Sequence, residues 1–296
     1  MTLELLHYVE MELPASDGPV LEEMLMAIGL AVSSWHRAES DTAILRVFLE
    51  NDVEAVQVAG QIAENLPDWT SLLNGNKPVL RTGTMQREDW AESWKKYFHT
   101  FRASRRIIVK PSWETFEAKA TDVVLELDPG MSFGTGYHGT TRACIEFIDE
   151  LRDELGPVSF LDVGCGSGIL SLAVAKLGFQ KLAAFDNDPQ AVQVALENLQ
   201  AAGITDVDVV CSEIADYAGG TGFRLVAANI LAHVLLDNAE SIAGFVDNSN
   251  GPGILILSGI LEGQYEQVKS CYEALGLKER QNRVIDEWKS GIFVKH

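Results

Sequence analysis

The chain has 296 residues, 47% of them hydrophobic, with four scattered cysteines and a formal net charge of −20. This length can build two domains with full cores. No apolar run reaches the roughly 18–20 residues of a membrane span, and the start MTLELLHYVEME lacks the pattern of a signal peptide. The cysteines form no CxxC pair, which argues against a disulfide framework or a zinc knuckle. We therefore expect a cytoplasmic protein that is not bound to a membrane.

The charge is uneven along the chain. Residues 1–68 carry a net charge of −11, residues 69–119 carry +5, and residues 120–296 carry −14. Because such an acidic chain repels nucleic-acid phosphates, we expect no direct binding to nucleic acid. The acidic N-terminal region would attract a basic partner protein. Surface acid that only keeps the protein soluble explains the same pattern, and charge alone does not separate these two interpretations.

Residues 1–70 predict a small α+β domain of the ferredoxin-like kind. The expected elements, in order, are a strand over 3–13, a helix over 19–28, strands over 31–37 and 43–49, and a helix capped by Asp52 that runs to about residue 66. Residues 78–85 could supply another strand. Nothing in this region has catalytic spacing, so we interpret it as a recognition or regulatory module.

Residues 71–105 are predicted to link this module to a catalytic domain over 106–296. A helix begins near Asp89, and its aromatic residues recur every three or four positions, which indicates one aromatic face. Such a face packs between modules more often than it binds a ligand. The arginines that follow, Arg102, Arg105 and Arg106, are interpreted as caps of this helix rather than as a nucleic-acid patch. Beyond them, residues 122–127 alternate like the hairpin partner of residues 106–110.

A loop rich in glycine and threonine follows, DPGMSFGTGYHGTT over residues 128–141. Its composition is typical of a shaped loop that covers a ligand. Thr140 or Thr141 either caps the next helix, over 142–155, or contacts the ligand. Phe133 packs over a cofactor or over the core, and His138 could order the loop. A metal site is not expected, because no second ligand stands at the required spacing.

The stretch FLDVGCGSG, residues 160–168, reads as a buried strand, a glycine turn and the start of a helix. The dinucleotide fingerprint has its third glycine three residues after the second, but here Gly168 comes two after Gly166. Asp162, two residues before Gly164, would repel phosphate and suits a cationic or hydroxyl-bearing ligand. S-adenosylmethionine fits, with its ammonium, its sulfonium and no phosphate. A tight turn without a ligand is the alternative.

The next strand, over 181–185, ends at the turn Asp186-Asn187-Asp188-Pro189. Pro189 suits the first helical position and Asp188 suits the cap. Asp186 has no role in starting the helix, so we expect it to accept hydrogen bonds from ribose hydroxyls. It stands 18 residues past Gly168, near the spacing of ~20 residues that the fingerprint predicts for such an acidic residue. An exposed turn carboxylate is the alternative.

The remaining strands are expected over 206–211, 225–228 and 254–258, with an antiparallel edge over 284–288 and 291–295. Repeated β-α units of this kind predict a doubly wound sheet with right-handed crossovers. Asn229, at the tip of the fourth strand, faces the same crevice as the glycine turn. Its amide could orient an amine that attacks a methyl group, or it could be a satisfied turn residue.

Three stretches, DPGMSFGTGYHGTT, DVGCGSGIL and ANIL, in this order and spacing, resemble ribosomal protein methyltransferase A, the family that modifies ribosomal large-subunit protein eleven. The stretches DWAESWKKYF, PSWE, DNDPQAV and LSGIL are similar too, so the resemblance covers about residues 86–296. It implies a class I Rossmann-like domain dependent on S-adenosylmethionine, preceded by a domain that docks the substrate. The implied reaction methylates lysine ε-amines and the N-terminal α-amine of that basic ribosomal protein. We take the chain to be a monomer.

The cofactor contacts of the family fall on Thr141, Gly164, Asp186 and Asn229. From the residues themselves we add Asp162, Gly166 and Phe133, and we assign the orientation of the amine to Asn229. One departure from the family pattern is Tyr137-His138-Gly139 before the two threonines, where the family usually has a small or His residue, then His, then Pro or Glu. Alternative functions are methylation of lysine on a different protein and a non-enzymatic module that binds an adenosine cofactor.

Overall fold

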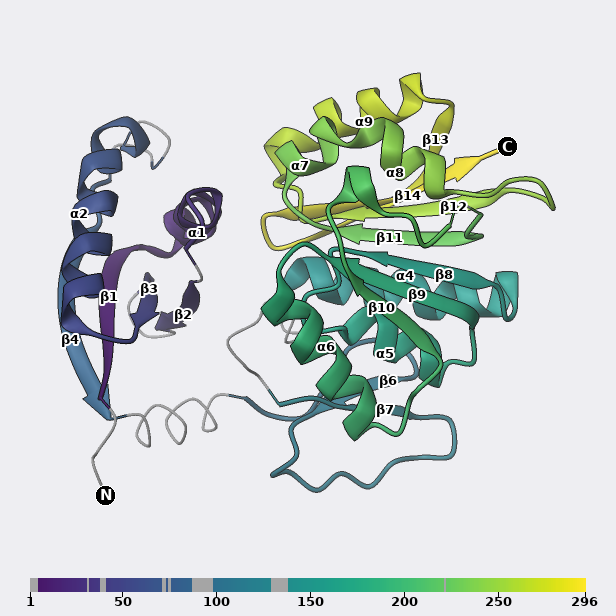
Figure 1. The fold of residues 1–296 in the computed structure, drawn as a ribbon, viewed down its shortest axis with the longest axis horizontal. Helices are drawn as coiled ribbons and strands as arrows, with labels where there is room; N and C mark the ends of the chain where they lie inside the picture. Colours follow the sequence, from purple (N-terminus) through teal and green to yellow (C-terminus); the bar gives the residue numbers. More distant parts are fainter. Residues whose placement is uncertain are drawn as a thin grey trace. The chain divides into compact units, whose positions relative to one another are not determined.

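The computed structural model describes residues 5–30, 32–37, 41–70, 73, 76–86, 98–128, 138–220 and 222–296. The chain forms two compact units, Met1–Phe98 and His99–His296 (Figure 1). Each unit has its own sheet and its own hydrophobic core. In the described part of the chain, no helix has the length and apolar character needed to cross a membrane.

The N-terminal unit has the ferredoxin-like arrangement β1-α1-β2-β3-α2-β4, as predicted. Its antiparallel sheet has the order β2-β3-β1-β4. Both helices pack on one face of the sheet, where Val9, Met11 and Leu45 meet Leu21 and Ile62. The bounds are β1 Leu5–Pro14, α1 Gly18–Ala27, β2 Ser33–Arg37, β3 Thr42–Leu49, α2 Asp52–Trp69 and β4 Val79–Gln86, with a short 3-10 turn at Ala15–Asp17.

Two details of this unit differ from the sequence expectations. The N-cap of α2 is Asn51, whose Oδ1 accepts a hydrogen bond from Glu54 N at 2.9 Å, so Asp52 is already helical. The possible strand over 78–85 is confirmed as β4, which pairs along its whole length with β1, so the sheet extends past the predicted domain boundary at residue 70. Part of the predicted linker, 71–105, is therefore a strand of this sheet. The predicted aromatic helix falls largely on residues 87–97, which lie outside the described residues.

The larger unit contains a seven-stranded sheet with the order β10-β9-β8-β11-β12-β14-β13. Five strands are parallel, and β14 and β13 run antiparallel at one edge. The doubly wound sheet is thereby confirmed. The strands are β8 Ser159–Val163, β9 Gln180–Asp186, β10 Val207–Cys211, β11 Leu225–Asn229, β12 Gly253–Ser258, β13 Leu277–Ile285 and β14 Trp288–Lys295.

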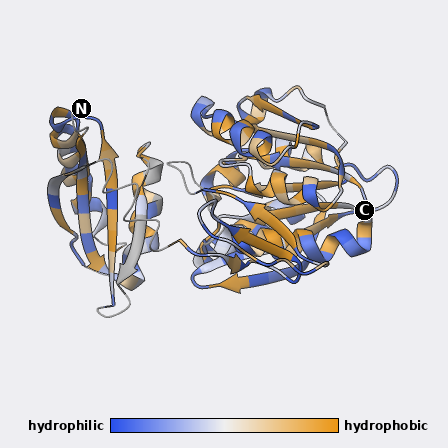
Figure 2. Ribbon diagram, turned by 90° about the horizontal axis from the view of Figure 1, so that it is seen from below, coloured by the Kyte–Doolittle hydropathy of each residue, from blue (hydrophilic) through white to orange (hydrophobic). Residues whose placement is uncertain are grey.

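Helices cover both faces of this sheet, and the strands between them are strongly apolar (Figure 2). One core layer holds Phe147, Phe160 and Leu172, and the other holds Leu161, Ile242 and Tyr272. The first layer is covered by α4 Gly139–Leu155, α5 Ile169–Lys176 and α6 Pro189–Ala201, and the second by α7 Ala232–Asp237, α8 Ala239–Phe245 and α9 Tyr265–Ala274. The predicted antiparallel edge is confirmed, but the bounds of its first strand are wrong. The hairpin turns at residues 286–287, so β13 runs from Leu277 to Ile285 and Trp288 already belongs to β14.

A three-stranded sheet precedes the seven-stranded one, with β5 Phe101–Arg102, β6 Ile107–Lys110 and β7 Val123–Glu126. The expected hairpin of residues 106–110 with 122–127 is wrong, because β6 and β7 are parallel. Residues 111–122 run between them as the crossover that a parallel pair needs. The antiparallel partner of β6 is instead β5.

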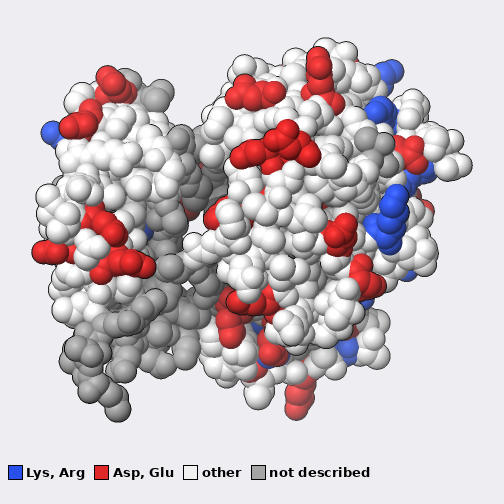
Figure 3. All heavy atoms as spheres, viewed as in Figure 1, with Lys and Arg blue, Asp and Glu red and all other residues white. Residues whose placement is uncertain are grey.

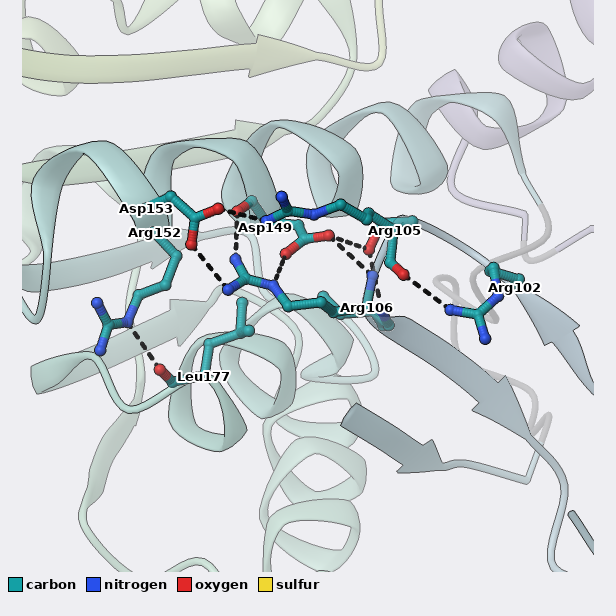
Figure 4. A network of polar contacts seen from close by, with 9 residues as sticks. Arg102, Arg105, Arg106, Asp149, Arg152, Asp153 and Leu177 are labelled. Carbon is teal, nitrogen blue, oxygen red and sulfur yellow. Dashed lines mark hydrogen bonds and ion pairs between the residues drawn. The ribbon is translucent and has the colours of Figure 1, made fainter. Parts of the chain in front are cut away.

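The arginines that were expected to cap a linker helix instead bind carboxylates within the larger unit (Figure 4). Arg106 Nε donates to Asp149 Oδ1 at 2.5 Å, Arg102 pairs with Asp122, and Arg105 pairs with Asp153. Asp149 is only 2% exposed and also accepts from Ser104 Oγ at 2.7 Å. The bonds of Arg105 and Arg106 attach the β5–β6 segment to α4, whereas Arg102 binds the turn before β7.

Candidate functional site

The predicted site residues meet at the carboxyl ends of the central parallel strands. Val163, the last residue of β8, is opposite Phe185 of β9 and Ala228 of β11. The next residues, Gly164, Asp186 and Asn229, therefore stand at the same level of the sheet. At β8 the strand order reverses, since β9 lies on one side and β11 on the other. Ligands of open α/β sheets bind at this switch point.

The glycine turn is built from left-handed residues. Gly164, Gly166 and Gly168 have φ angles of +71°, +53° and +75°, which only glycine adopts at little cost. A Cβ at Gly168 would lie 3.0 Å from the Cβ of Ala195, so the turn also packs closely on α6. The N–H groups of Gly164 and Cys165 both donate to the carbonyl of Phe185, at 2.9 and 3.0 Å. The turn is thus tied to the tip of β9.

Asp162 lies beneath this turn and is 1% exposed. Its Oδ2 accepts hydrogen bonds from the hydroxyl and the N–H of Ser171, at 2.7 and 3.1 Å. Burial raises the pKa of this carboxyl to about 7, against the opposing effect of the two Ser171 hydrogen bonds. A nearby cation would favour the charged form and return the pKa toward its ordinary value.

Asp186 has a structural task that the sequence did not reveal. Its Oδ2 accepts from Gly166 N at 2.9 Å, and its Oδ1 accepts from Asp188 N at 3.0 Å. A carboxylate has about four lone-pair positions, so each oxygen can still accept a ligand hydroxyl. Asp188 caps α6 through Gln190 N at 2.8 Å, and Pro189 occupies the first turn, as predicted.

The helix α4 begins earlier than expected. Its N-cap is His138, so Thr140 and Thr141 are not caps but buried residues of the first turn. Thr141 Oγ1 accepts a hydrogen bond from Asn229 Nδ2 at 3.3 Å, which joins the Gly/Thr segment to the tip of β11. The other amide atom, Asn229 Oδ1, is buried and has no hydrogen-bond partner among the described residues. A buried acceptor in this state needs a ligand or water to satisfy it.

His138 connects α4 to the edge hairpin. Its Nδ1 is 2.8 Å from Thr140 Oγ1, and its ring packs on Trp288 with the centroids 4.8 Å apart. Burial lowers the pKa of His138 to about 4, so the ring is neutral at pH 7. Phe133 lies outside the described residues. Within the described ranges, no group of three or more potential metal ligands comes together.

Sequence reasoning missed Ser258, which is opposite Asn229 at the tip of β12. Its buried hydroxyl donates to the carbonyl of Thr140 at 3.1 Å and lies 2.7 Å from the hydroxyl of Ser290. Because a carbonyl only accepts, Ser290 must donate to Ser258. The available signal was a lone serine that ends the apolar run ILIL of the strand predicted over 254–258.

Strand order, glycine turn and the polar groups at the β8–β11 edge together define a class I Rossmann-like methyltransferase domain that uses S-adenosylmethionine as its methyl donor. The family model described as ribosomal protein L11 methyltransferase (PrmA) matches residues 23–296, and the chain therefore belongs to this family. The resemblance drawn from the sequence is confirmed.

Individual relatives agree with this assignment. The ribosomal protein L11 methyltransferase of Syntrophotalea carbinolica is 39% identical over 86% of this chain and 82% of its own length. That of Geobacter metallireducens is 36% identical over 96% of both chains. Among solved structures, the ribosomal protein L11 methylase of Lactobacillus delbrueckii subsp. bulgaricus superposes with a TM-score of 0.60 at 30% identity, over 67% of this chain and all of the other.

Proposed function

We propose that this chain methylates ribosomal protein L11, on lysine ε-amines and on the N-terminal α-amine, in the cytoplasm. The family and the names of its relatives support the acceptor. The observation that carries the proposal is the buried, unpartnered Oδ1 of Asn229 beside the glycine turn. A hydrogen bond donated by the N–H of an acceptor amine would satisfy this oxygen.

The residues at the strand tips suit S-adenosylmethionine. Two carboxylates, Asp162 and Asp186, flank the turn, and no lysine or arginine stands among the tips of β8, β9, β11 and β12. This donor set favours a cationic ligand with hydroxyls over a phosphate. We assign the ammonium group to the neighbourhood of Asp162, Gly164 and Gly166, and the ribose hydroxyls to Asp186. Thr141, which accepts a hydrogen bond from Asn229, would contact the cofactor. A cofactor contact by Phe133 stays a prediction from the sequence.

Bound S-adenosylmethionine supplies an electrophilic methyl group on a positively charged sulfur. The acceptor amine must present a neutral lone pair ~3 Å from that carbon, in line with the bond that breaks. A free lysine has a pKa of about 10.4, so holding it neutral at pH 7 costs roughly 4–5 kcal/mol unless the site desolvates it. Asn229 Oδ1 would accept one amine N–H and aim the lone pair. We assign no general base, and the proton leaves to solvent.

Recognition of the acceptor is assigned to the N-terminal unit. Residues 1–68 carry a net charge of −11, and acidic side chains are spread over the visible face of the molecule (Figure 3). A basic protein acceptor fits this charge. We expect its binding to weaken with added salt, because exposed charges are screened. A flat dependence on salt between low and moderate ionic strength would contradict electrostatic recognition.

The decisive test incubates the chain with labelled S-adenosylmethionine and the separated proteins of bacterial ribosomes, followed by mass spectrometry of the labelled band. Label on lysines and the N-terminus of L11 is the expected result. Label on lysines of another protein would support the alternative function, methylation of lysine on a protein other than L11. No label on any protein, combined with calorimetric binding of S-adenosylmethionine but not NAD, would favour the non-enzymatic alternative.

A further inference from the structure

Gly259, the residue directly after β12, lies against the main chain of Ile230, the residue directly after β11 (strands labelled in Figure 1). A Cβ at Gly259 would overlap the Ile230 carbonyl oxygen and would stand 2.8 Å from its carbonyl carbon and 3.0 Å from its nitrogen. That nitrogen belongs to the peptide bond that joins Asn229 to Ile230. The carbonyl carbon and oxygen belong to the next peptide bond, between Ile230 and Leu231. The absence of a side chain at Gly259 is therefore what allows the main chain of Ile230, on both sides of its Cα, to occupy its position.

The opposite side of Ile230 meets a second glycine. A Cβ at Gly164 would overlap the Cγ2 atom of the Ile230 side chain. Gly164 and Gly259 both have left-handed φ angles, +71° and +79°. Ile230 thus sits between the glycine turn, through its side chain, and the tip of β12, through its main chain.

The contacts of Ile230 with Gly164 and with Gly259 differ in how easily Ile230 could move away from an added side chain. The side chain of Ile230 can change rotamer, whereas its main chain can move only if the segment after β11 moves. Gly259 and Ser258 are buried, and Ser258 is held by hydrogen bonds to Thr140 and Ser290. Ile230 and Leu231 are only half-buried. A side chain added at Gly259 would therefore displace the Ile230 main chain, including its peptide bond to Asn229, rather than β12.

We infer that Gly259 is a positioning residue of the methyl-transfer site, acting through the Ile230 main chain to hold Asn229 in the orientation that presents Oδ1 to the acceptor amine. The inference rests on the proposed function, since it concerns the amine side of that reaction. According to this inference, different residues hold the cofactor side and the amine side of the site. The cofactor side is held by Asp186 and the Phe185 carbonyl, and the amine side is held by Gly259.

The test compares Gly259→Ala with two glycine controls. Gly276 has φ +87° and open space at its Cβ position, so Gly276→Ala carries the backbone strain without a collision. Gly253 begins the same strand, and a Cβ there would stand 2.5 Å from the Asp247 carbonyl oxygen, so Gly253→Ala carries a collision far from the strand tips. Thermal midpoint, calorimetric Kd for S-adenosylmethionine, and kcat and KM for L11 are measured for all three.

For Gly259→Ala we expect kcat to fall by at least about tenfold while the cofactor Kd stays within about threefold of wild type. Both controls should keep kcat within about threefold, whatever their thermal midpoints. Equal kcat values for Gly259→Ala and the controls would overturn the inference. An equal loss of cofactor affinity and kcat would also overturn it, because the amine side would then not be separately held.

A second pair remains informative if Gly259→Ala does not fold. Ile230→Val keeps the Cγ2 methyl against Gly164, and Ile230→Ala removes it. We expect Ile230→Ala to lower kcat by about fivefold or more, and Ile230→Val to stay within about twofold. Similar kcat values for both would contradict a role for the wedged Ile230. A wild-type chain that fails to methylate L11 would instead contradict the proposed function, and not the geometry at Gly259.

Discussion

The carboxyl edge of the seven-stranded sheet and the outer face of the four-stranded sheet both carry carboxylates, but they use them differently. On the outer face, Glu10 accepts from Arg46 at 2.5 and 2.7 Å, and Arg81 pairs with Glu12 at 3.2 Å. At the carboxyl edge, Asp162 is buried without a cationic partner among the described residues. Asn229 Oδ1 accepts no hydrogen bond from the described residues.

The two regions differ in whether their polar side chains have partners within the chain. Side chains that satisfy one another make a face that is stable and chemically inactive. A buried carboxyl with a raised pKa and an unpartnered amide oxygen both cost stability, and both lie at the edge that carries the glycine turn. Features of this kind persist where they serve a ligand.

The largest effect is expected at Asn229. Asn229→Ala removes both the bond to Thr141 and the free acceptor, so kcat for L11 should fall by about 100- to 1000-fold. The matched control is Asn238→Ala, whose Nδ2 donates to the Val234 carbonyl at 3.0 Å. That variant should stay within about threefold of wild type in kcat. Turnover and cofactor affinity near wild type for Asn229→Ala would remove Asn229 from the site.

A second comparison concerns ion pairs and folding stability. Asp149→Ala leaves Arg106 without its buried partner, and we expect the free energy of unfolding to fall by about 3 kcal/mol. Arg81→Ala removes an exposed charge, 59% exposed as a side chain, and should cost less than about 1 kcal/mol. Urea denaturation of both variants measures the contrast. Equal losses would mean that the Arg106 network is no stronger than a surface pair.

Asp186 and Asp188 are two residues apart, but we expect substitution of Asp186 to weaken cofactor binding and substitution of Asp188 to lower folding stability. Asp186→Ala frees Gly166 N and removes the proposed ribose acceptor, so the Kd for S-adenosylmethionine should rise by about 10- to 100-fold. Asp188→Ala removes only the cap of α6, which costs about 1 kcal/mol of stability. Calorimetry and thermal denaturation of both variants test this. A normal cofactor Kd in Asp186→Ala would exclude its binding role.

His138 and Asp162 are expected to oppose each other as the pH changes. The pKa of His138 is about 4 in the folded chain against 6.5 ordinarily, so the unfolded state binds more protons between these values, and stability rises with pH there. The pKa of Asp162 is about 7 against 3.8 ordinarily, so the folded state binds more protons, and stability falls as pH rises.

A variant that lacks one of the two groups should show the pH dependence of stability that the other group causes. As the pH rises from 4 to 7, His138→Gln should lose stability relative to wild type and Asp162→Asn should gain it, each by roughly 3 kcal/mol across the range. Urea denaturation at several pH values measures the difference curves. Curves parallel to wild type for His138→Gln would contradict a buried neutral imidazole, and parallel curves for Asp162→Asn would contradict a raised carboxyl pKa.

Much of the fold could be predicted because its signals are local. Glycine spacing, the Asp188-Pro189 helix start and the apolar runs of the parallel strands each depend on residues close in sequence. The errors arose where distant partners decide. The parallel pairing of β6 with β7, the start of α4 at a His138 that packs on Trp288, and the attachment of Arg105 and Arg106 to α4 all involve segments that periodicity cannot relate.

The class of the chain, its methyl donor and its family follow from the sequence alone, because the glycine turn and its neighbours form contiguous motifs whose chemistry depends on residue type and spacing. The role of each polar atom follows only from the folded arrangement. That arrangement engaged both oxygens of Asp186 with main-chain N–H groups, brought Thr141 to Asn229, and set Gly259 against Ile230. Those relations depend on which strand tips become neighbours, and the register of the folded sheet alone determines that.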